Sequence, residues 1–468
     1  MGGYIPYPDE IRRAMLSEIG VKNIDALFDD IPADMRAGEL DLPPGKSELE
    51  TRRILADIAA RNRVFPTIFR GGGAYRHYIP SIVKEIASRA AFLTAYTPYQ
   101  AEASQGILQI IFEYQSEICA LTGMDVSNAS VYDGASAAAE AVAMCRERKR
   151  RRALLAGSAR GDTLETIETY GRAANENCLR LPERGGLLDM DALRAALTVE
   201  DACLYIESPN RCGLIEDVAQ AAEICRAAGV KLIQGCNPIA LALLKTPAEQ
   251  GADIAVGDGQ PLGIPLGFGG PYLGFIACRS AMTRRLPGRI VGETRDADGK
   301  RAYVLTLQAR EQHIRREKAS SSICTNQALC ALTATVYIAA MGPVGLADTA
   351  RQCYAKAHYT ADRLEEAGFK RRFTGEFFNE FITECPADFD VLERRFEDEG
   401  ILGGLEMDGG VLWAVTEMNT REEIDKLARI AAGTGQESPI KAGVGRGQKA
   451  PPSFGAAGQS PALKEAAR

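Results

Sequence analysis

The chain has 468 residues, enough for roughly two to four domains, and its 46% hydrophobic and 25% charged residues are typical of a soluble globular protein. Its 55 Lys and Arg against 62 Asp and Glu give a formal net charge of −7, which argues against nucleic acid as the main partner. No apolar run approaches the roughly 20 residues that cross a bilayer, so we expect no membrane span.

The 12 cysteines form no CxxC pair, and the three histidines are far apart in the sequence. This distribution predicts reduced, mostly buried thiols in a cytoplasmic protein and no metal site.

Residues 1–63 are predicted to form a helical N-terminal extension. Apolar residues recur at helical spacing from Ile11 to Ile19. Ser47-Glu48-Leu49-Glu50 is a capping-box pattern that opens a further helix through Asn62, after the breaker Pro43-Pro44-Gly45.

Residues 64–330 are predicted to form a large α/β domain. Short apolar runs such as Cys203–Glu207 and Val230–Ile233 alternate with helical segments such as Val218–Ala228. Strand, helix and strand at this spacing indicate right-handed βαβ units and a mostly parallel sheet.

Residues 331–433 are predicted to form a smaller C-terminal α+β domain, entered by a helix over Gln327–Met341 that Gly342-Pro343 separates from a helix over Gly345–Ala367. Residues 434–468 are rich in Gly, Ala, Pro, Lys and Gln and nearly devoid of large apolar side chains. They are predicted to be a disordered tail.

Two charged or polar motifs flank one predicted helix. Arg146–Arg152 follows the alanine-rich segment Ala135–Cys145, where cations at a helix C-terminus are favoured, so we interpret the basic run as structural rather than as a nucleic-acid site. Tyr132, Asp133 and Gly134 open the same helix. A helix start can cradle a phosphate, but Asp133 would repel one, and a plain helix cap is the alternative.

Two loops combine aromatic residues, Arg and turn formers, which suits a binding surface or a subunit interface, with a purely structural loop as the alternative. The candidate residues in them are Arg76, His77, Tyr96, Thr97, Tyr99 and Gln100. The charged segment Gln308–Lys318 resembles a solvated helix, and its His313 is either structural or part of a site.

Several of these segments together resemble one family, the alpha subunit (subunit 1) of split-type bacterial glycine dehydrogenase (decarboxylating), the P-protein of the glycine cleavage system. The resemblance covers about residues 1–433. It is carried by Tyr75–Pro80, Tyr96–Gln100, Phe112–Gln115, Leu121–Asp125, Gly259–Gly263 and Arg310–Ala319.

The resemblance implies the fold of pyridoxal-phosphate (PLP) transferases of the aspartate aminotransferase type (fold type I), in an α₂β₂ assembly. Gln260 lies where such enzymes carry their Schiff-base lysine, and an amide nitrogen cannot replace an amine in that chemistry. Gln234 or Asn237 lies where the catalytic subunit has the aspartate that supports the cofactor's ring nitrogen. PLP is therefore expected on the partner beta subunit, and no catalytic residue is expected on this chain alone.

The implied reaction is the decarboxylation of glycine, with release of CO₂ and transfer of the aminomethyl group to the lipoyl arm of H-protein. Two alternatives remain open. One is a self-sufficient PLP enzyme that uses another lysine, such as Lys231, Lys245 or Lys318. The other is a non-catalytic scaffold subunit.

Overall fold

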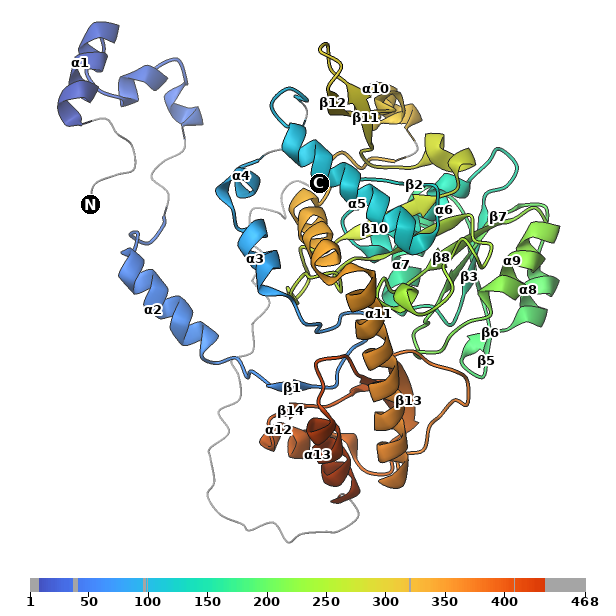
Figure 1. The fold of residues 1–468 in the computed structure, drawn as a ribbon. Coiled ribbons are helices and arrows are strands. Elements are labelled where there is room, and N and C mark those ends of the chain that lie inside the picture. The colour runs from blue at the N-terminus through green and yellow to red at the C-terminus, as the bar shows by residue number, and fades with distance from the viewer. Residues whose placement is uncertain are drawn as a thin grey trace, which may run out of the picture. The chain divides into compact units, whose positions relative to one another are not determined.

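A computed structural model describes residues 8–36, 41–95, 98, 100–319, 321–407 and 409–433, and the chain divides into two units, Met1–Val64 and Phe65–Arg468 (Figure 1). The proposed tail, 434–468, lies outside the described residues, as do Tyr96, Thr97 and Tyr99.

The first unit is helical, with α1 over Asp9–Ile19, α2 over Glu48–Ala59 and two short 3₁₀ turns between them. Gly20, at φ 84°, ends α1 in the left-handed conformation that glycine adopts without a steric penalty. The predicted capping box is confirmed, because the Ser47 and Glu50 side chains each accept a hydrogen bond from the other residue's backbone N–H. The helix ends three residues before the predicted Asn62.

The second unit is built on a seven-stranded sheet of order β2-β10-β9-β8-β7-β3-β4. All neighbouring strands pair in parallel except β10, which is antiparallel to β2 and β9, so the predicted mostly parallel sheet is confirmed. The strands are β2 Val126–Ser127, β3 Arg152–Ala156, β4 Cys178–Leu181, β7 Asp201–Glu207, β8 Lys231–Gly235, β9 Ile254–Asp258 and β10 Gly274–Cys278.

Helices cover both faces of this sheet, because strands in a parallel sheet are apolar on both sides. On one face, Leu204 packs in a core that includes Ile118 and Ala331. On the other face, the neighbouring Cys203 packs with Ala138 and Leu164. The covering helices are α5 Gln105–Thr122, α9 Val218–Ala227 and α11 Ala328–Glu366 on the first face, and α6 Gly134–Cys145 and α7 Gly161–Ala173 on the second.

Helix α11 is interrupted at Gly342, whose φ of 61° and ψ of −179° are not helical, and Pro343 follows it. The predicted break is therefore confirmed. By length and composition alone α11 could cross a membrane, contrary to the sequence expectation that no apolar run is long enough. Its residues Ala331, Tyr337 and Cys353 are fully buried in the protein core, while 33% of the apolar window as a whole is buried.

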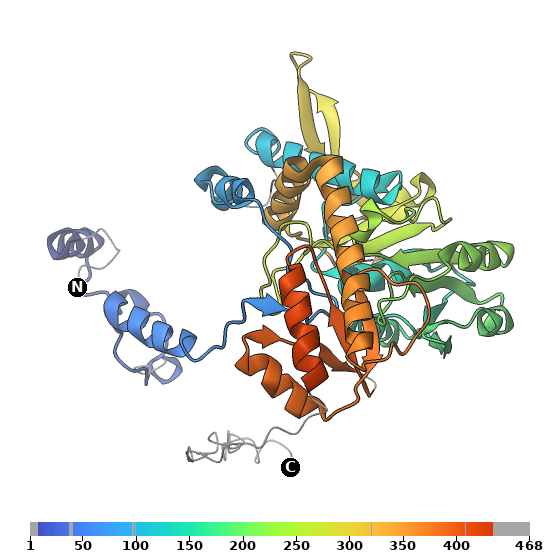
Figure 2. The same cartoon turned by 60° about the horizontal axis from the view of Figure 1, so that its bottom comes forward.

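The C-terminal part of this unit carries an antiparallel sheet of order β13-β16-β15, with helices α12 and α13 packed around a third core that contains Trp413. Figure 2 shows α13 alongside the second half of α11. The bounds are β13 Glu380–Glu384, α12 Phe389–Asp398, β15 Leu405–Met407, β16 Gly410–Ala414 and α13 Arg421–Ala432, close to the predicted helices. Thr67–Ile68 (β1) pairs in parallel with Ile401–Leu402 (β14) and so ties the start of the unit to this part.

The remaining elements are short connections, including a hairpin that the sequence analysis did not predict, β11 paired with β12. They are α3 Ser81–Ala87, α4 Ala90–Leu93, β5 Glu183–Arg184, β6 Leu187–Leu188, α8 Met190–Ala196, β11 Val291–Arg295, β12 Arg301–Leu305 and α10 Gln312–Arg315.

Candidate functional site

A cavity of about 320 Å³ lies where three parallel strands end. Its walls are the carboxyl ends of β7, β8 and β9, the starts of α6 and α7, and the backbone of Gly72–Ala74. Ligands in open α/β sheets bind at this edge, because the loops after the strands diverge there. The cavity is therefore the candidate site.

The start of α6 is occupied by two carboxylates. Asp133 caps the helix by accepting the Ser136 backbone N–H at 2.7 Å, and Asp258 accepts the Gly134 N–H at 3.0 Å. Burial raises the pKa of the Asp258 carboxyl. Two of the N–H groups that could cradle a phosphate, those of Gly134 and Ser136, thus already bind carboxylates of the chain itself, and the helix-cap alternative describes the role of Asp133.

Gln260 is buried at the same edge, and both ends of its amide bind backbone groups. Its Nε2 donates to the carbonyl oxygens of Tyr75, at 3.0 Å, and Ile264, at 2.8 Å. Its Oε1 accepts the Tyr75 backbone N–H at 3.1 Å. The side chain therefore ties the loop after β9 to the segment before α3, and both amide N–H donors are already used within the chain.

One wall of the cavity carries an ion pair, between the buried Glu207 and the partly exposed Arg160, that the sequence did not predict. Glu207, the last residue of β7, accepts the side chain of Arg160 at 2.5 Å and the Arg160 backbone N–H at 2.9 Å. Burial raises the pKa of Glu207, while Arg160 lowers it. The only sign of this pair in the sequence was the glutamate at the end of a predicted strand. Arg160 is 47 residues from Glu207 in the sequence, and only the order of strands in the sheet brings the two side chains together.

The other predicted cofactor-site residues do not line the cavity. Gln234 is buried in β8 on the sheet face of Leu232, and its Oε1 has no hydrogen-bond partner among the described residues. Asn237 Oδ1 accepts the Ile239 N–H at 2.9 Å and so shapes a turn. Tyr132 is 40% exposed just before α6.

The segment before α3 is held mainly inside the chain. Tyr75 is 6% exposed, and its hydroxyl donates to Glu380 Oε2 at 2.6 Å. His77 is buried against Glu417. Arg76 is exposed, and its guanidinium donates a hydrogen bond to the carbonyl oxygen of Pro66 at 2.8 Å.

Two further candidates lie away from the cavity walls. Gln100 is exposed. His313 is about half exposed, with Nδ1 3.5 Å from Glu311 Oε2. The segment Gln308–Lys318 is not the single solvated helix suggested by its charges but three short turns, and the buried ion pair of Arg289 with Glu311 anchors it to the body.

Three of the six basic residues in the run after α6 form ion pairs, and Arg150 donates to backbone carbonyl oxygens. Arg146 and Arg151 both pair with Glu176, and Arg152 pairs with the buried Asp201 at 2.6 Å. These contacts favour the structural interpretation of the run.

Comparison with known proteins assigns the family. The model of the glycine cleavage system P-protein family matches residues 3–431. The chain belongs to the glycine cleavage system P-protein family. The match covers the helical first unit as well as the body that carries the cavity.

Curated members of the P-protein family match over nearly their whole length. Proteins of Syntrophomonas wolfei and Moorella thermoacetica, each named probable glycine dehydrogenase (decarboxylating) subunit 1, are 47% identical over 435 residues and 46% identical over 440 residues. In both cases the alignment covers 92% of this chain and 99% of the relative.

Solved structures agree with this family and fold. A crystal structure of glycine decarboxylase (P-protein) in inhibitor-bound form is 39% identical, with a TM-score of 0.87 over 92% of this chain and 100% of that one. A sphingosine-1-phosphate lyase from Burkholderia pseudomallei is 15% identical, with a TM-score of 0.60 over 86% of this chain and 93% of the lyase, and supports the fold alone. The fold is that of the PLP-dependent enzymes of fold type I, as the resemblance implied.

The cavity in this P-protein chain does not fit PLP. Among the described residues no lysine lines it, and two N–H groups of the helix start that would hold the phosphate already bind Asp133 and Asp258. Coulomb repulsion from these carboxylates opposes a phosphate dianion. Lys231 pairs with Asp253 at the opposite end of β8, and Lys245 and Lys318 are exposed outside the cavity.

Proposed function

We propose that this chain is the alpha subunit of a cytoplasmic glycine decarboxylase with an α₂β₂ assembly. Together with a beta subunit, it decarboxylates glycine and delivers the aminomethyl group to the lipoyl arm of H-protein, releasing CO₂. PLP resides on the beta subunit. The whole-length match to proteins named glycine dehydrogenase subunit 1 carries this proposal.

The role of this chain in that assembly is to shape and support the cleft. Gln260 and Glu380 hold the segment before α3 with four hydrogen bonds, so the backbone of Gly72–Ala74 is fixed at the cavity wall. Such a fixed wall suits a subunit that positions a partner's catalytic groups rather than one that reacts itself.

Exchange of labelled bicarbonate into the glycine carboxyl group tests the proposal. The purified chain, its beta subunit and their mixture would each be assayed with PLP and lipoylated H-protein. We expect exchange from the mixture and none from this chain alone. Equal exchange by the beta subunit with and without this chain would contradict the proposal and favour the scaffold alternative.

A self-sufficient PLP enzyme is the remaining rival, and it predicts a different observation. Visible absorbance of an internal PLP–lysine adduct on the purified chain would favour it. The absence of lysine from the cavity lining argues against it.

A further inference from the structure

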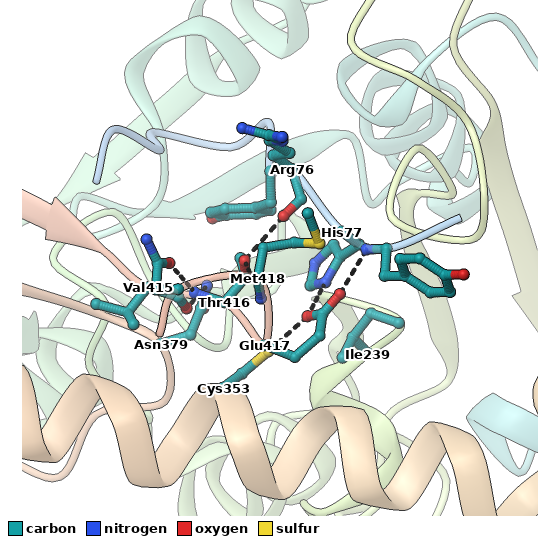
Figure 3. Close-up of polar contacts among 12 residues, drawn as sticks. Arg76, His77, Ile239, Cys353, Asn379, Val415, Thr416, Glu417 and Met418 are labelled. Carbon is teal, nitrogen blue, oxygen red and sulfur yellow. Dashed lines mark hydrogen bonds and ion pairs between the residues drawn. The ribbon is translucent and has the colours of Figure 1, made fainter. Parts of the chain in front are cut away.

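A buried cluster of three potential metal ligands lies outside the cavity. His77 comes from the segment before α3, Cys353 from the second half of α11, and Glu417 from the loop between β16 and α13 (Figure 3). One ligand atom from each residue lies within 4.8 Å of the other two. The side chains of His77 and Glu417 are 3% and 11% exposed, and Cys353 is fully buried.

The Glu417 carboxylate is oriented by the backbone and lies between the other two ligands. Its Oε1 accepts the Tyr78 N–H at 2.6 Å, which directs Oε2 toward the imidazole and the thiol. Oε2 lies 2.7 Å from His77 Nδ1 and 3.4 Å from Cys353 Sγ. Glu417 is itself anchored, because Lys356 Nζ donates to its carbonyl oxygen at 2.6 Å.

These distances approach those of a tetrahedral site. Zinc bonds of about 2.0–2.3 Å place neighbouring ligand atoms about 3.3–3.7 Å apart. The sulfur and the carboxylate oxygen already have that spacing. A small rotation of the imidazole or the carboxylate would lengthen the 2.7 Å distance between His77 Nδ1 and Glu417 Oε2 to this spacing. A water molecule would then be the fourth ligand of the metal.

The charges around the cluster suit a divalent ion. A thiolate and a carboxylate together neutralise a dication, which a buried site requires. Burial and the Glu417 carboxylate raise the pKa of the Cys353 thiol, so the thiol form is favoured until a bound cation offsets the added negative charge, and the neighbouring Lys356 opposes this rise only in part. Tyr337, on the same helix, is neutral because burial raises the pKa of its hydroxyl well above neutrality.

We propose that His77, Cys353 and Glu417 form a binding site for a divalent transition metal of the zinc type. On binding, the thiol loses its proton to solvent while a sulfur–metal bond forms. In the metal-bound form the imidazole binds through Nδ1 and carries its proton on Nε2, which has no hydrogen-bond partner among the described residues. The carboxylate is already ionised, and no electron is transferred.

The sequence analysis expected no metal site because the histidines are far apart from one another. The proposed ligands are one histidine, one cysteine and one glutamate, and Glu417 is 340 residues from His77 and 64 from Cys353. Only the folded chain brings them together, so no sequence motif could reveal them.

Cobalt titration of the full-length chain, after treatment with a chelator, tests the site. We expect about one Co²⁺ per chain, a thiolate-to-cobalt charge-transfer band, and visible bands of tetrahedral intensity. Affinity should rise about tenfold per pH unit below the thiol pKa, because one proton is released. Zinc added afterwards should displace the cobalt and remove the bands.

Matched variants locate the metal. Cys353→Ala should abolish the charge-transfer band, while Cys330→Ala, at a buried cysteine on the same helix outside the cluster, should keep it. Glu417→Gln removes a charged ligand and should weaken binding by at least the roughly 10- to 100-fold that loss of an outer-shell partner costs. A wild-type chain without these bands, or a Cys353→Ala chain that retains them, would overturn the proposal. The wild-type titration decides the matter even if a variant fails to fold.

Discussion

Gln260 shows how a single residue at the candidate site can have a structural role. Its amide makes three hydrogen bonds to backbone groups, two of them on Tyr75, and the side chain is buried. A buried amide that bridges two segments of backbone stabilises the fold because each of its partners would otherwise be left unpaired.

Gln260→Ala should therefore lower the free energy of unfolding by about 2–3 kcal/mol, the cost of leaving buried backbone groups unpaired. Urea denaturation of the purified chain measures this. Gln250→Ala is the matched control, since its amide makes a single exposed hydrogen bond to Lys245 O. If the two substitutions lowered the free energy of unfolding equally, the hydrogen bonds of Gln260 would contribute no more to stability than one exposed hydrogen bond.

Glu117 is a residue whose protonation should contribute a pH effect near neutrality. It lies beside an apolar groove lined by Leu121, Ile338 and Leu346, and burial raises its pKa to about 7. In the unfolded chain the pKa of this carboxyl is near its ordinary value of 4.5. Between pH 4.5 and about pH 7 the folded state therefore binds more protons than the unfolded state. The contribution of Glu117 to the free energy of unfolding is therefore fully present at acid pH and declines as the pH rises through that range.

Glu117→Gln should remove this decline. We expect the variant to equal the wild type in stability at acid pH and to exceed it by about 1–2 kcal/mol above neutrality, a reduced figure because the side chain is partly open to solvent. Denaturation midpoints across the pH range give the comparison. A difference between the two proteins that does not vary with pH would refute the assignment to Glu117.

Part of the site could be predicted from sequence at the residue scale. Asp133 before a run of small residues indicated a helix cap, and the structure shows that cap. The pairing of Glu207 with Arg160 could not be predicted, because it depends on which strand and which helix start meet at the sheet edge. The burial of His77 was equally hidden, since Glu417 is 340 residues away.

At the scale of elements, local signals fixed helix boundaries well and tertiary contacts decided the rest. The break in α11 follows from glycine and proline at positions 342 and 343. The segment Gln308–Lys318 has the composition of a solvated helix, yet Arg316 adopts φ 53° and the buried Glu311 pairs with Arg289. Helix propensity is a weak preference that one buried ion pair can outweigh.

Gly342→Ala should destabilise the chain by about 1–3 kcal/mol, because its combination of positive φ and extended ψ is essentially restricted to glycine. An added Cβ would meet no atom within 4 Å, so the cost is in the backbone alone. Gly106→Ala, in helix α5 and equally free of contacts, should be neutral or slightly stabilising. Thermal unfolding of both variants tests this, and a neutral Gly342→Ala would show that the kink is not required.

At the scale of the whole molecule, a fold of PLP enzymes is retained, and groups of the chain itself pair with one another around the cavity at its sheet edge. Two carboxylates bind the start of α6, the Gln260 amide bridges two backbone segments, and Glu207 pairs with Arg160 at one wall. The resemblance in the sequence predicted the fold, but the hydrogen bonds that fill the site needed the structure.

Substitution of the exposed Arg76 tests whether the segment before α3 contacts the beta subunit. Its guanidinium makes one hydrogen bond, to a carbonyl in the same segment, so Arg76→Ala should change the stability of the free chain by no more than about 0.5 kcal/mol. If Arg76 contacts the beta subunit, activity of the reconstituted complex should fall at least tenfold. Arg194→Ala, another exposed arginine, is the control. Loss of stability without loss of activity per complex would contradict an interface role.

In the proposed function, this chain supports a cofactor that the beta subunit binds. Borohydride reduction of the reconstituted, PLP-loaded complex, followed by peptide mapping, tests this, because reduction fixes the cofactor to the lysine that holds it. We expect a stoichiometric pyridoxyl adduct on a lysine of the beta subunit and none on this chain. A stoichiometric adduct on any single lysine of this chain would contradict it.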